Sequence, residues 1–276
     1  MPKDTVFIND QQGLKDLIDL VARQDNSIGD LQPLLYIDLE GERLSRHGKV
    51  SLVTVLVYLG LGLEYSYIID IHTLGSTAFS TVGSLGKSLK DILESPQILK
   101  VFFDVRNDSD ALYAHYGIAL QGVRDIQLME NASRPTTKRR KFLSGLSKCI
   151  EGVTYGKKRD QWKLSKEKGE SLWDPKKGGS YNVFNTRPLP NEITSYCVGD
   201  VRYLSALYRK YYRDRNDWNC LIAEESQKRV AESQTVEYQP HEPEKGMSSW
   251  STEQNKMLDS WNTPYKSRDY FSHSKK

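Results

Sequence analysis

The fold of this chain is decided by residues 34–71, which read LLYIDLEGERLSRHGKVSLVTVLVYLGLGLEYSYIIDI. Runs of β-branched and other apolar residues of strand length alternate here with short turns that contain glycine, a pattern typical of consecutive strands. We expect three strands, at residues 34–39, 50–58 and 65–71. Because the turns between them are short, the three strands should pair as an antiparallel meander.

The sequence on either side of this segment alternates between extended and helical patterns. Before it, residues 5–8 form a short strand pattern, and apolar residues recur at helical spacing over residues 14–21. After it, we expect a helix at 85–93, a fourth strand at 99–103, a short helix at 108–116, a fifth strand at 123–127 and a strong helix at 193–211. This order predicts an α/β fold with a mixed five-stranded sheet and helices on both faces.

A change of composition sets the expected domain boundary. Residues 157–185 are charged, contain glycine and show weak periodicity, which favours a long loop with short helices. Beyond about Ser226 the chain becomes polar, with few aliphatic residues and scattered aromatic side chains such as Trp250. We therefore expect one domain over residues 1–230 and a polar C-terminal tail over residues 231–276 that is flexible or loosely docked.

Cysteine usage and hydropathy exclude several classes of protein. The three cysteines, Cys149, Cys197 and Cys220, are far apart and show no CxxC spacing, which argues against a disulfide framework and fits a reducing compartment. The first residues, MPKDTVFINDQQ, lack the basic and apolar regions of a signal peptide, and no stretch approaches the roughly 18 apolar residues of a membrane span. These features predict an intracellular protein, nuclear or cytoplasmic, that is not secreted and has no membrane partner.

Positive charge is concentrated in residues 134–168. This segment holds twelve Lys and Arg residues and three acidic residues, although the net charge of the whole chain is only +3. Such an excess indicates either an anionic partner or a solvated basic loop. As candidate contacts with a nucleic-acid backbone we name Lys138, Arg139, Arg140, Lys141, Lys157, Lys158 and Arg159. Three nearby aromatic residues, Tyr155, Trp162 and Trp173, could stack on bases or could anchor the segment to the core.

Two acidic residues lie on the first strand of the expected meander. Asp38 and Glu40 are two positions apart, so their side chains point to the same face of the sheet. Two carboxylates on one side of a central strand repel each other unless a cation holds them, and oxygen ligands suit Mg²⁺ or Mn²⁺. Taken alone, most D-x-E pairs are surface acids.

Further acidic and phenolic side chains could join them. Asp108 opens the helix after the fourth strand, where it could also serve as an N-cap, and Asp104 and Asp110 are nearby competitors. Tyr196 and Asp200 are four residues apart and therefore neighbours on one face of the last helix. An unpaired aspartate beside an apolar stripe is costly, although a Tyr–Asp hydrogen bond would also explain this pair.

Three segments resemble the motifs of the DEDD 3′→5′ exonuclease superfamily, which includes ribonuclease D and the proofreading domains. They are YIDLEGERLSRHGKVSLVTV at 36–55, LKVFFDVRNDSDALYAHYGI at 99–118 and RPLPNEITSYCVGDVRYL at 187–204. The likeness is greatest to the ribonuclease D-like branch that contains Egalitarian, and it covers residues 5–212. The remaining residues show no counterpart of the helical C-terminal domain of ribonuclease D.

The resemblance implies an RNase H-like fold and assigns the site residues. Its four acids would be Asp38, Glu40, Asp108 and Asp200, and Tyr196 would mark the tyrosine subtype, since position 195 is serine rather than histidine. They would hold two divalent ions, Mg²⁺ or Mn²⁺. Asp38 would bridge both ions, Glu40 and Asp200 would hold the first, and Asp108 would help hold the second.

The implied activity is hydrolysis of phosphodiester bonds from the 3′ end of single-stranded nucleic acid, with RNA favoured over DNA because of the likeness to ribonuclease D. Two alternatives stay open. The chain could be a nucleic-acid-binding or adaptor module that uses the same fold without turnover, or a nuclease of another RNase H-like family. Intact acids favour the active enzyme, and the Tyr-x-x-x-Asp helix argues against another RNase H-like family.

Overall fold

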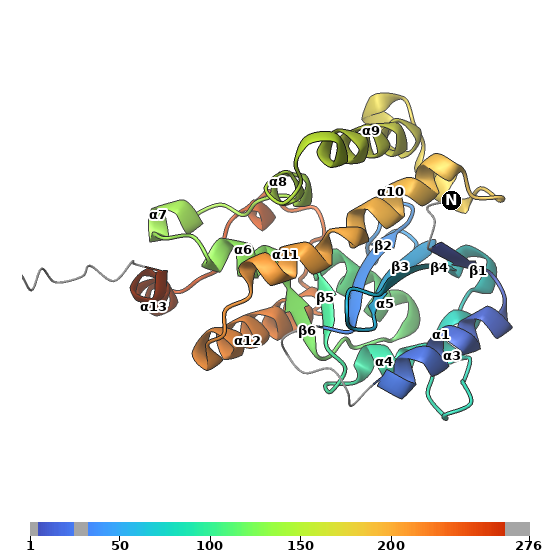
Figure 1. Ribbon diagram of the computed structural model, residues 1–276, viewed down its shortest axis with the longest axis horizontal. Coiled ribbons are helices and arrows are strands. Elements are labelled where there is room, and N and C mark those ends of the chain that lie inside the picture. Colours follow the sequence, from blue (N-terminus) through green and yellow to red (C-terminus); the bar gives the residue numbers. More distant parts are fainter. Residues whose placement is uncertain (1–4, 25–32, 263–276) are drawn as a thin grey trace, which may run out of the picture.

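The computed structural model describes residues 5–24 and 33–262 of the chain, and a six-stranded mixed sheet lies at its centre (Figure 1). The strands are β1 (Thr5–Ile8), β2 (Leu35–Glu40), β3 (Leu52–Tyr58), β4 (Glu64–Asp70), β5 (Lys100–Phe102) and β6 (Val123–Asp125). Their spatial order is β1-β4-β3-β2-β5-β6.

The pairing of the strands confirms the expected meander. Strands β2, β3 and β4 run antiparallel in sequence order, and β5 and β6 continue the sheet in parallel from β2. The expected count of five was wrong by one, because β1 pairs in parallel with β4 and becomes an edge strand of the same sheet. All four of its residues pair with β4, from Ser66 to Ile69, despite the short length of the strand.

Helices cover both faces of the sheet, as the sequence predicted (Figure 1). One layer holds α1 (Gln11–Gln24), α4 (Leu89–Glu94) and α5 (Arg106–Tyr116), which pack with Leu35, Ile37 and Leu39 of β2. The opposite layer holds α6 (Ile126–Ala132), α10 (Asn191–Arg202) and α11 (Leu204–Tyr211), which pack with Tyr36. The alternation along β2 therefore directs residues 36, 38 and 40 towards the layer of α10.

Short helices complete the two layers. They are α2 (Ile71–Leu74), α3 (Thr77–Ser80), α7 (Thr137–Arg140) and α8 (Leu146–Glu151), with 3-10 turns at Pro175–Lys177, Tyr181–Asn185 and Pro243–Gly246. None of the helices in the described part of the chain combines the length and the apolar character that a bilayer crossing would need.

Helix α9 (Gly156–Trp173) lies over α10 and occupies much of the segment that the sequence predicted as a loop. The expectation was wrong because only two residues of this helix, Trp162 and Gly169, are buried, so its apolar stripe is too sparse to show a period. Its remaining positions are mostly Lys, Glu, Ser and Gln, several of which favour a helix without contributing to a core.

The part of the expected tail that the structure describes is docked on the domain. Helix α12 (Asn216–Ser233) crosses the expected boundary, and residues 234–262, which include α13 (Thr252–Asn262), pack against the layer of α6. Trp250 is 7% exposed and donates its indole N–H to the side chain of Asn131 at 2.7 Å. Of the two states expected for the tail, flexible or loosely docked, residues 231–262 adopt a docked one through a few large apolar residues and polar contacts, while residues 263–276 lie outside the described part.

Candidate active site

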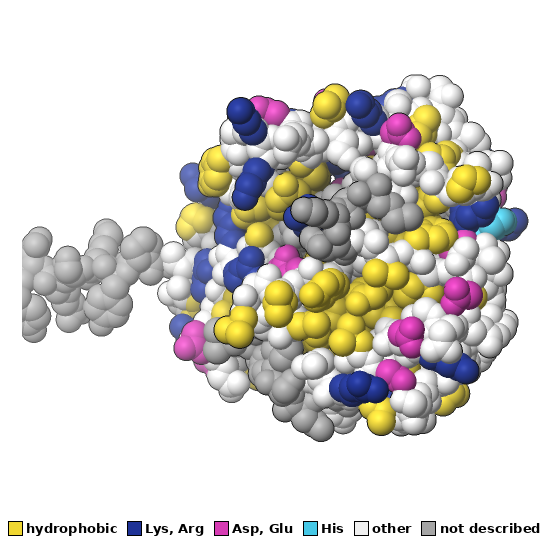
Figure 2. Space-filling view, turned by 45° about the vertical axis from the view of Figure 1, so that its right-hand side comes forward, with side chains coloured by type: hydrophobic (Ala, Val, Ile, Leu, Met, Phe, Trp, Pro, Cys, Tyr) yellow, Lys and Arg dark blue, Asp and Glu magenta, His cyan; other side chains and the backbone are white. Residues whose placement is uncertain are grey.

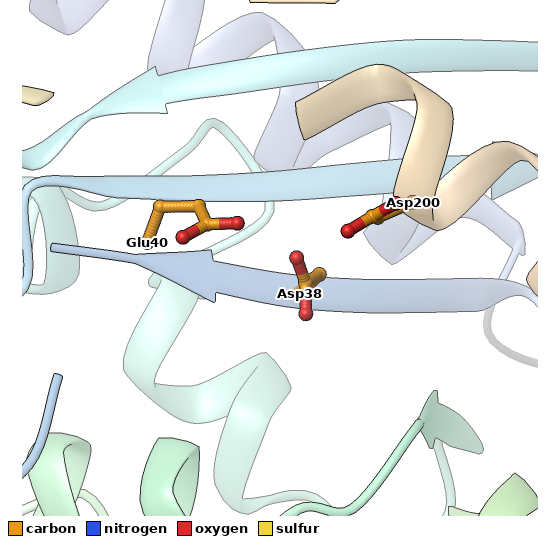
Figure 3. A group of neighbouring side chains, drawn as sticks. All are labelled: Asp38, Glu40 and Asp200. Atoms are coloured by element: carbon orange, nitrogen blue, oxygen red, sulfur yellow. The ribbon is translucent and has the colours of Figure 1, made fainter. Parts of the chain in front are cut away.

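Three carboxylates from two elements converge above the centre of the sheet. Asp38 and Glu40 project from β2 on the face that carries Tyr36, and Asp200 reaches down to them from α10 (Figure 3). One oxygen of each of the three lies within 4.8 Å of the others. Asp200 is buried, whereas Asp38 and Glu40 are partly exposed, so the cluster is open to solvent on one side.

Asp108 lies beside this cluster rather than within it. It is the third residue of α5, is 6% exposed, and does not cap the helix, which begins at Arg106. Burial raises the pKa of Asp108 well above its usual value, and the charge that adds most to this is that of Asp38. The carboxyl group thus lies in the electrostatic field of Asp38 on β2.

The two competing acids of the same motif are held by arginines. Asp104 pairs with Arg106 at 2.5 Å, and Asp110 pairs with Arg46 at 2.5 Å. These ion pairs fix the motif-one loop and the start of α5, which gives both acids a structural role. With Asp104 and Asp110 held in ion pairs, Asp108 remains the candidate acid of this segment.

Tyr196 joins the carboxylates from one turn earlier on α10. Its hydroxyl lies near Glu40 and Asp200 and acts on both carboxyl groups as a hydrogen-bond donor, which moderates the rise of their pKa values. Burial and the neighbouring charge of Glu40 raise the pKa of Tyr196 well above its usual value, so the phenol keeps its proton. The proximity of Tyr196 and Asp200 fits the Tyr–Asp pair expected as an alternative explanation, and the hydroxyl is also near the acid on β2.

The raised pKa values of the clustered carboxyl groups indicate that a bound cation would stabilise their ionised form. Burial, together with the charge of Asp200, raises the pKa of Asp38 to about 7. Burial and the charge of Asp38 raise the pKa of Glu40 well above its usual value, and burial also raises the pKa of Asp200. Carboxylates that resist ionisation when alone become ionised when a divalent ion neutralises them, and this all-oxygen donor set fits Mg²⁺ or Mn²⁺.

Lys166 is a site residue that sequence reasoning missed. Its ammonium group donates to both oxygens of Asp200, at 2.8 and 3.1 Å. Burial lowers the pKa of Lys166, but Asp200 and Glu40 more than offset this, so the pKa is raised. The signal that could have found it is the helical spacing of Trp162, Lys166, Gly169 and Trp173, which was overlooked because the segment was predicted as a loop.

The basic residues named from the sequence divide into exposed and buried groups. Arg140 is fully buried and forms an ion pair with Asp259 and a hydrogen bond with Asn255, so it was wrong to name it as a nucleic-acid contact. It ties α7 to α13 instead. The exposed members are Lys138, Arg139, Lys141, Lys157, Lys158 and Arg159. On the face drawn in Figure 2, lysine and arginine side chains gather along the left-hand side of the molecule.

The tryptophans of α9 anchor this helix to the core. Trp162 is 5% exposed and lies against Tyr203, with a centroid separation of 6.3 Å. Trp173 stacks on Tyr181 at 5.7 Å and approaches Tyr196 at 6.0 Å. The anchoring role is therefore the one seen for both tryptophans, whereas Tyr155 is 75% exposed.

A groove of about 560 Å³ lies between α9 and the α10–α11 layer. Its lining includes three basic side chains, those of Lys158, Arg202 and Arg209. Only Lys158 was named from the sequence, because the other two lie outside the basic segment and are brought to it by the fold.

Comparison with known proteins agrees with these features. A family model described as 3′-5′ exonuclease (DNA_pol_A_exo1) matches residues 5–213. The piRNA biogenesis protein EXD1 of Mus musculus is 37% identical over 99 residues, which are 36% of this chain and 15% of the mouse protein. The human protein of the same name is 37% identical over 99 residues, or 17% of its length. The matched stretch is thus a small part of these relatives.

Solved structures share the architecture. RNase D of Trypanosoma brucei, in its complex with RNA U12, aligns with a TM-score of 0.67 at 18% identity, over 92% of this chain and 78% of that chain. The catalytic core of RRP6 from Trypanosoma brucei aligns with a TM-score of 0.53 at 17% identity, over 82% of this chain and 51% of that chain. At these identities the likeness shows a common fold, and together with the family match it leads to one conclusion: the chain belongs to the 3′-5′ exonuclease family of the DEDD superfamily.

Proposed function

We propose that this chain is a divalent-metal-dependent 3′→5′ exonuclease that removes nucleotides from the 3′ end of single-stranded nucleic acid, with RNA preferred. The observation that carries the proposal is the convergence of Asp38, Glu40 and Asp200 within 4.8 Å, with the hydroxyl of Tyr196 close to the last two. Membership of the exonuclease family makes this arrangement a candidate for hydrolysis rather than a chance group of acids.

The acids divide into two sets of metal ligands. Glu40 and Asp200 would help hold one ion, Asp108 would hold a second, and Asp38 would contribute to both. Bound there, Mg²⁺ or Mn²⁺ would supply an ionised water near neutral pH and offset the negative charge of the phosphate and of the leaving oxygen. All four side chains need to be ionised for this role, which binding of the cations favours.

Tyr196 would position the attacking water. Its hydroxyl stays protonated at neutral pH and already points at Glu40 and Asp200. A donor in that place can hold a water oxygen between the carboxylates and the scissile phosphate without taking a proton from it. The tyrosine would thus contribute orientation, the carboxylates would stay ionised as ligands, and the proton that the water releases would pass to solvent.

The preference for RNA rests on relatives. The similar structure from Trypanosoma brucei is an RNase D with bound RNA, and the similar mammalian proteins are named for piRNA biogenesis. On this chain, the exposed basic side chains of α7 and of the start of α9 would follow the phosphate backbone, and Tyr155 could stack on a base. No partner protein is implied by these features.

A second candidate is a binding module without turnover. One observation favours it: the ammonium group of Lys166 engages both carboxylate oxygens of Asp200, which a metal ion would also need. Such a protein would bind single strands and leave them intact.

A degradation assay with matched single-stranded RNA and DNA substrates separates the two candidates. Single-stranded RNA and DNA of one sequence, each with a free 3′-hydroxyl or a blocked 3′ end, are incubated with the protein and Mn²⁺. We expect shortening from the free 3′ end only, faster for RNA, and loss of shortening in Asp200→Asn. Binding without shortening of any substrate would support the module, and cleavage inside the 3′-blocked strands would contradict an exonuclease.

A further inference from the structure

Lys166 brings a positive charge into the cluster of acids. Its amine nitrogen lies 2.8 and 3.1 Å from the two oxygens of Asp200 and 4.9 Å from the centre of the Tyr196 ring. The side chain is only 14% exposed, and that of Asp200 is 6% exposed. The lysine, which belongs to α9, therefore contacts both oxygens of this carboxylate.

The helix that carries Lys166 is fixed on α10 by close packing. A Cβ atom at Gly169 would lie 2.5 Å from the Cβ of Tyr196, and a Cβ atom at Gly199 would meet the Trp162 ring at 3.6 Å. Residues 162, 166 and 169 share one face of α9, so packing on both sides of Lys166 sets its Cα position. Motion at this place is then confined to the lysine side chain, which has four rotatable bonds.

A divalent ion and Lys166 compete for the same oxygens. Asp200 is one of the three acids close enough to share an ion, and both of its oxygens already accept hydrogen bonds from the ammonium group. A carboxylate ligand must turn an oxygen lone pair towards the ion, and two positive centres that close repel each other. The lysine must therefore withdraw or lengthen its contact when an ion is held there.

An alternative partner for the displaced lysine is within reach. Glu170 lies one turn along α9, and its charge already acts on the Lys166 ammonium. Glu170 also receives the ammonium of Lys177, but a carboxylate can accept several donors. Lys166 thus has acidic neighbours inside the cluster, Asp200 and Glu40, and one outside it, Glu170.

We propose that Lys166 is a resident counter-ion that holds Asp200 in the metal-free protein, is displaced when a divalent ion binds, and thereby sets the metal affinity of the site. The proposal rests on the metal site of the proposed function. A lysine with a purely structural ion pair would stabilise the fold without opposing the ion, so the two roles differ in a measurable way.

Titration calorimetry with Mn²⁺ alone, without substrate, tests this role. We compare the wild type with Lys166→Gln, which removes the charge but keeps a donor for Asp200, and with Lys166→Met as a second neutral variant in case one does not fold. Lys168→Gln, an exposed lysine on the same helix, is the matched control for charge loss. Lys166→Arg keeps the charge.

The expected result is tighter Mn²⁺ binding by roughly 5- to 150-fold in the neutral Lys166 variants, the usual range for coupling between two ligands. Their thermal midpoint in chelator should fall below that of the wild type, while Lys168→Gln and Lys166→Arg should stay close to the wild type in affinity. Equal or weaker Mn²⁺ binding by both neutral variants would overturn the role of Lys166 and leave the metal site standing. Absence of Mn²⁺ binding in every protein would overturn the metal site as well.

Discussion

Tyr196 and Asp200 lie one turn apart on α10, and the tyrosine hydroxyl acts on the aspartate carboxyl group as a nearby hydrogen-bond donor. It acts in the same way on Glu40 of β2, so it lies near acids of both the helix and the strand. The two residues of α10 nevertheless have different roles in the proposed reaction, because one would bind an ion and the other would hold water. Their substitutions should therefore be separable.

Tyr196→Phe should slow hydrolysis and leave metal binding intact. One hydrogen bond directed at a charged group is worth about 1.5–3 kcal/mol, which corresponds to roughly a ten- to 150-fold loss of rate. Single-turnover kinetics at saturating Mg²⁺ measure this loss in the chemical step. Asp200→Asn should instead remove nearly all turnover and weaken metal binding.

Tyr203→Phe provides the control for the tyrosine. This residue packs against Trp162 at the end of α10 and lies outside the acid cluster. It should turn over substrate at the rate of the wild type. If Tyr196→Phe does the same, Tyr196 serves in packing only and has no part in the chemistry.

The stability of the metal-free protein should fall as the pH rises. The pKa of Asp38 is raised to about 7 in the fold, against about 3.9 in an unfolded chain. The folded state therefore holds this proton more tightly, and the resulting stability is complete below about pH 4 and is lost as the pH rises through about 7. Since Asp38 is partly exposed, we expect a loss on the order of 1–3 kcal/mol.

Asp38→Asn isolates this contribution. Asparagine carries no proton to lose, so the decline of the thermal midpoint in chelator between pH 5 and 8 should be shallower in the variant, which should remain folded but inert. Saturating Mg²⁺ should flatten the decline of the wild type because it stabilises the ionised form. Parallel curves for both proteins in chelator would mean that Asp38 titrates normally.

Features encoded in one continuous segment of the sequence could be predicted, whereas contacts between residues far apart in the chain could not. The meander was predicted because residues 34–71 hold three β-branched runs, and the acids were found because residues 36–55, 99–118 and 187–204 keep the order of the superfamily motifs. Arg140 was misassigned because its pairing with Asp259 spans more than a hundred positions of the chain. Lys166 was missed because its segment was predicted as a loop, whereas it lies on a helix that packs on the helix of its partner Asp200.

Removal of the C-terminal segment should destabilise the domain. Truncation after Ser233 would expose Arg140 and the surface beneath Trp250, both of which are buried in the complete chain. Trp250→Ala alone should cost about 3–5 kcal/mol of unfolding free energy. Chemical denaturation measures this cost, with Met257→Ala on the half-exposed side of α13 as the control. A truncated protein as stable as the complete chain would show that the segment is not needed for the fold.

Neutralising the exposed basic residues should weaken binding of single strands. Replacement of Lys138, Arg139 and Lys141, or of Lys157, Lys158 and Arg159, by glutamine should lower the affinity for RNA. For single strands, each lost phosphate contact should reduce the slope of log affinity against log salt by about 0.7. Fluorescence anisotropy at several salt concentrations gives this slope for each triple variant. A slope equal to that of the wild type would identify that group as solvated surface.

The most direct test of the central claim is the metal requirement of strand shortening. A 5′-labelled single-stranded RNA is incubated with the wild-type protein in Mg²⁺ or Mn²⁺, in chelator, and in chelator followed by excess metal. We predict a ladder that shortens one nucleotide at a time from the 3′ end with either ion, none in chelator, and recovery when metal is returned, because the carboxylates of Asp38, Glu40 and Asp200 form an all-oxygen site. Undiminished shortening in chelator, or an intact strand under every condition, would contradict a metal-dependent exonuclease.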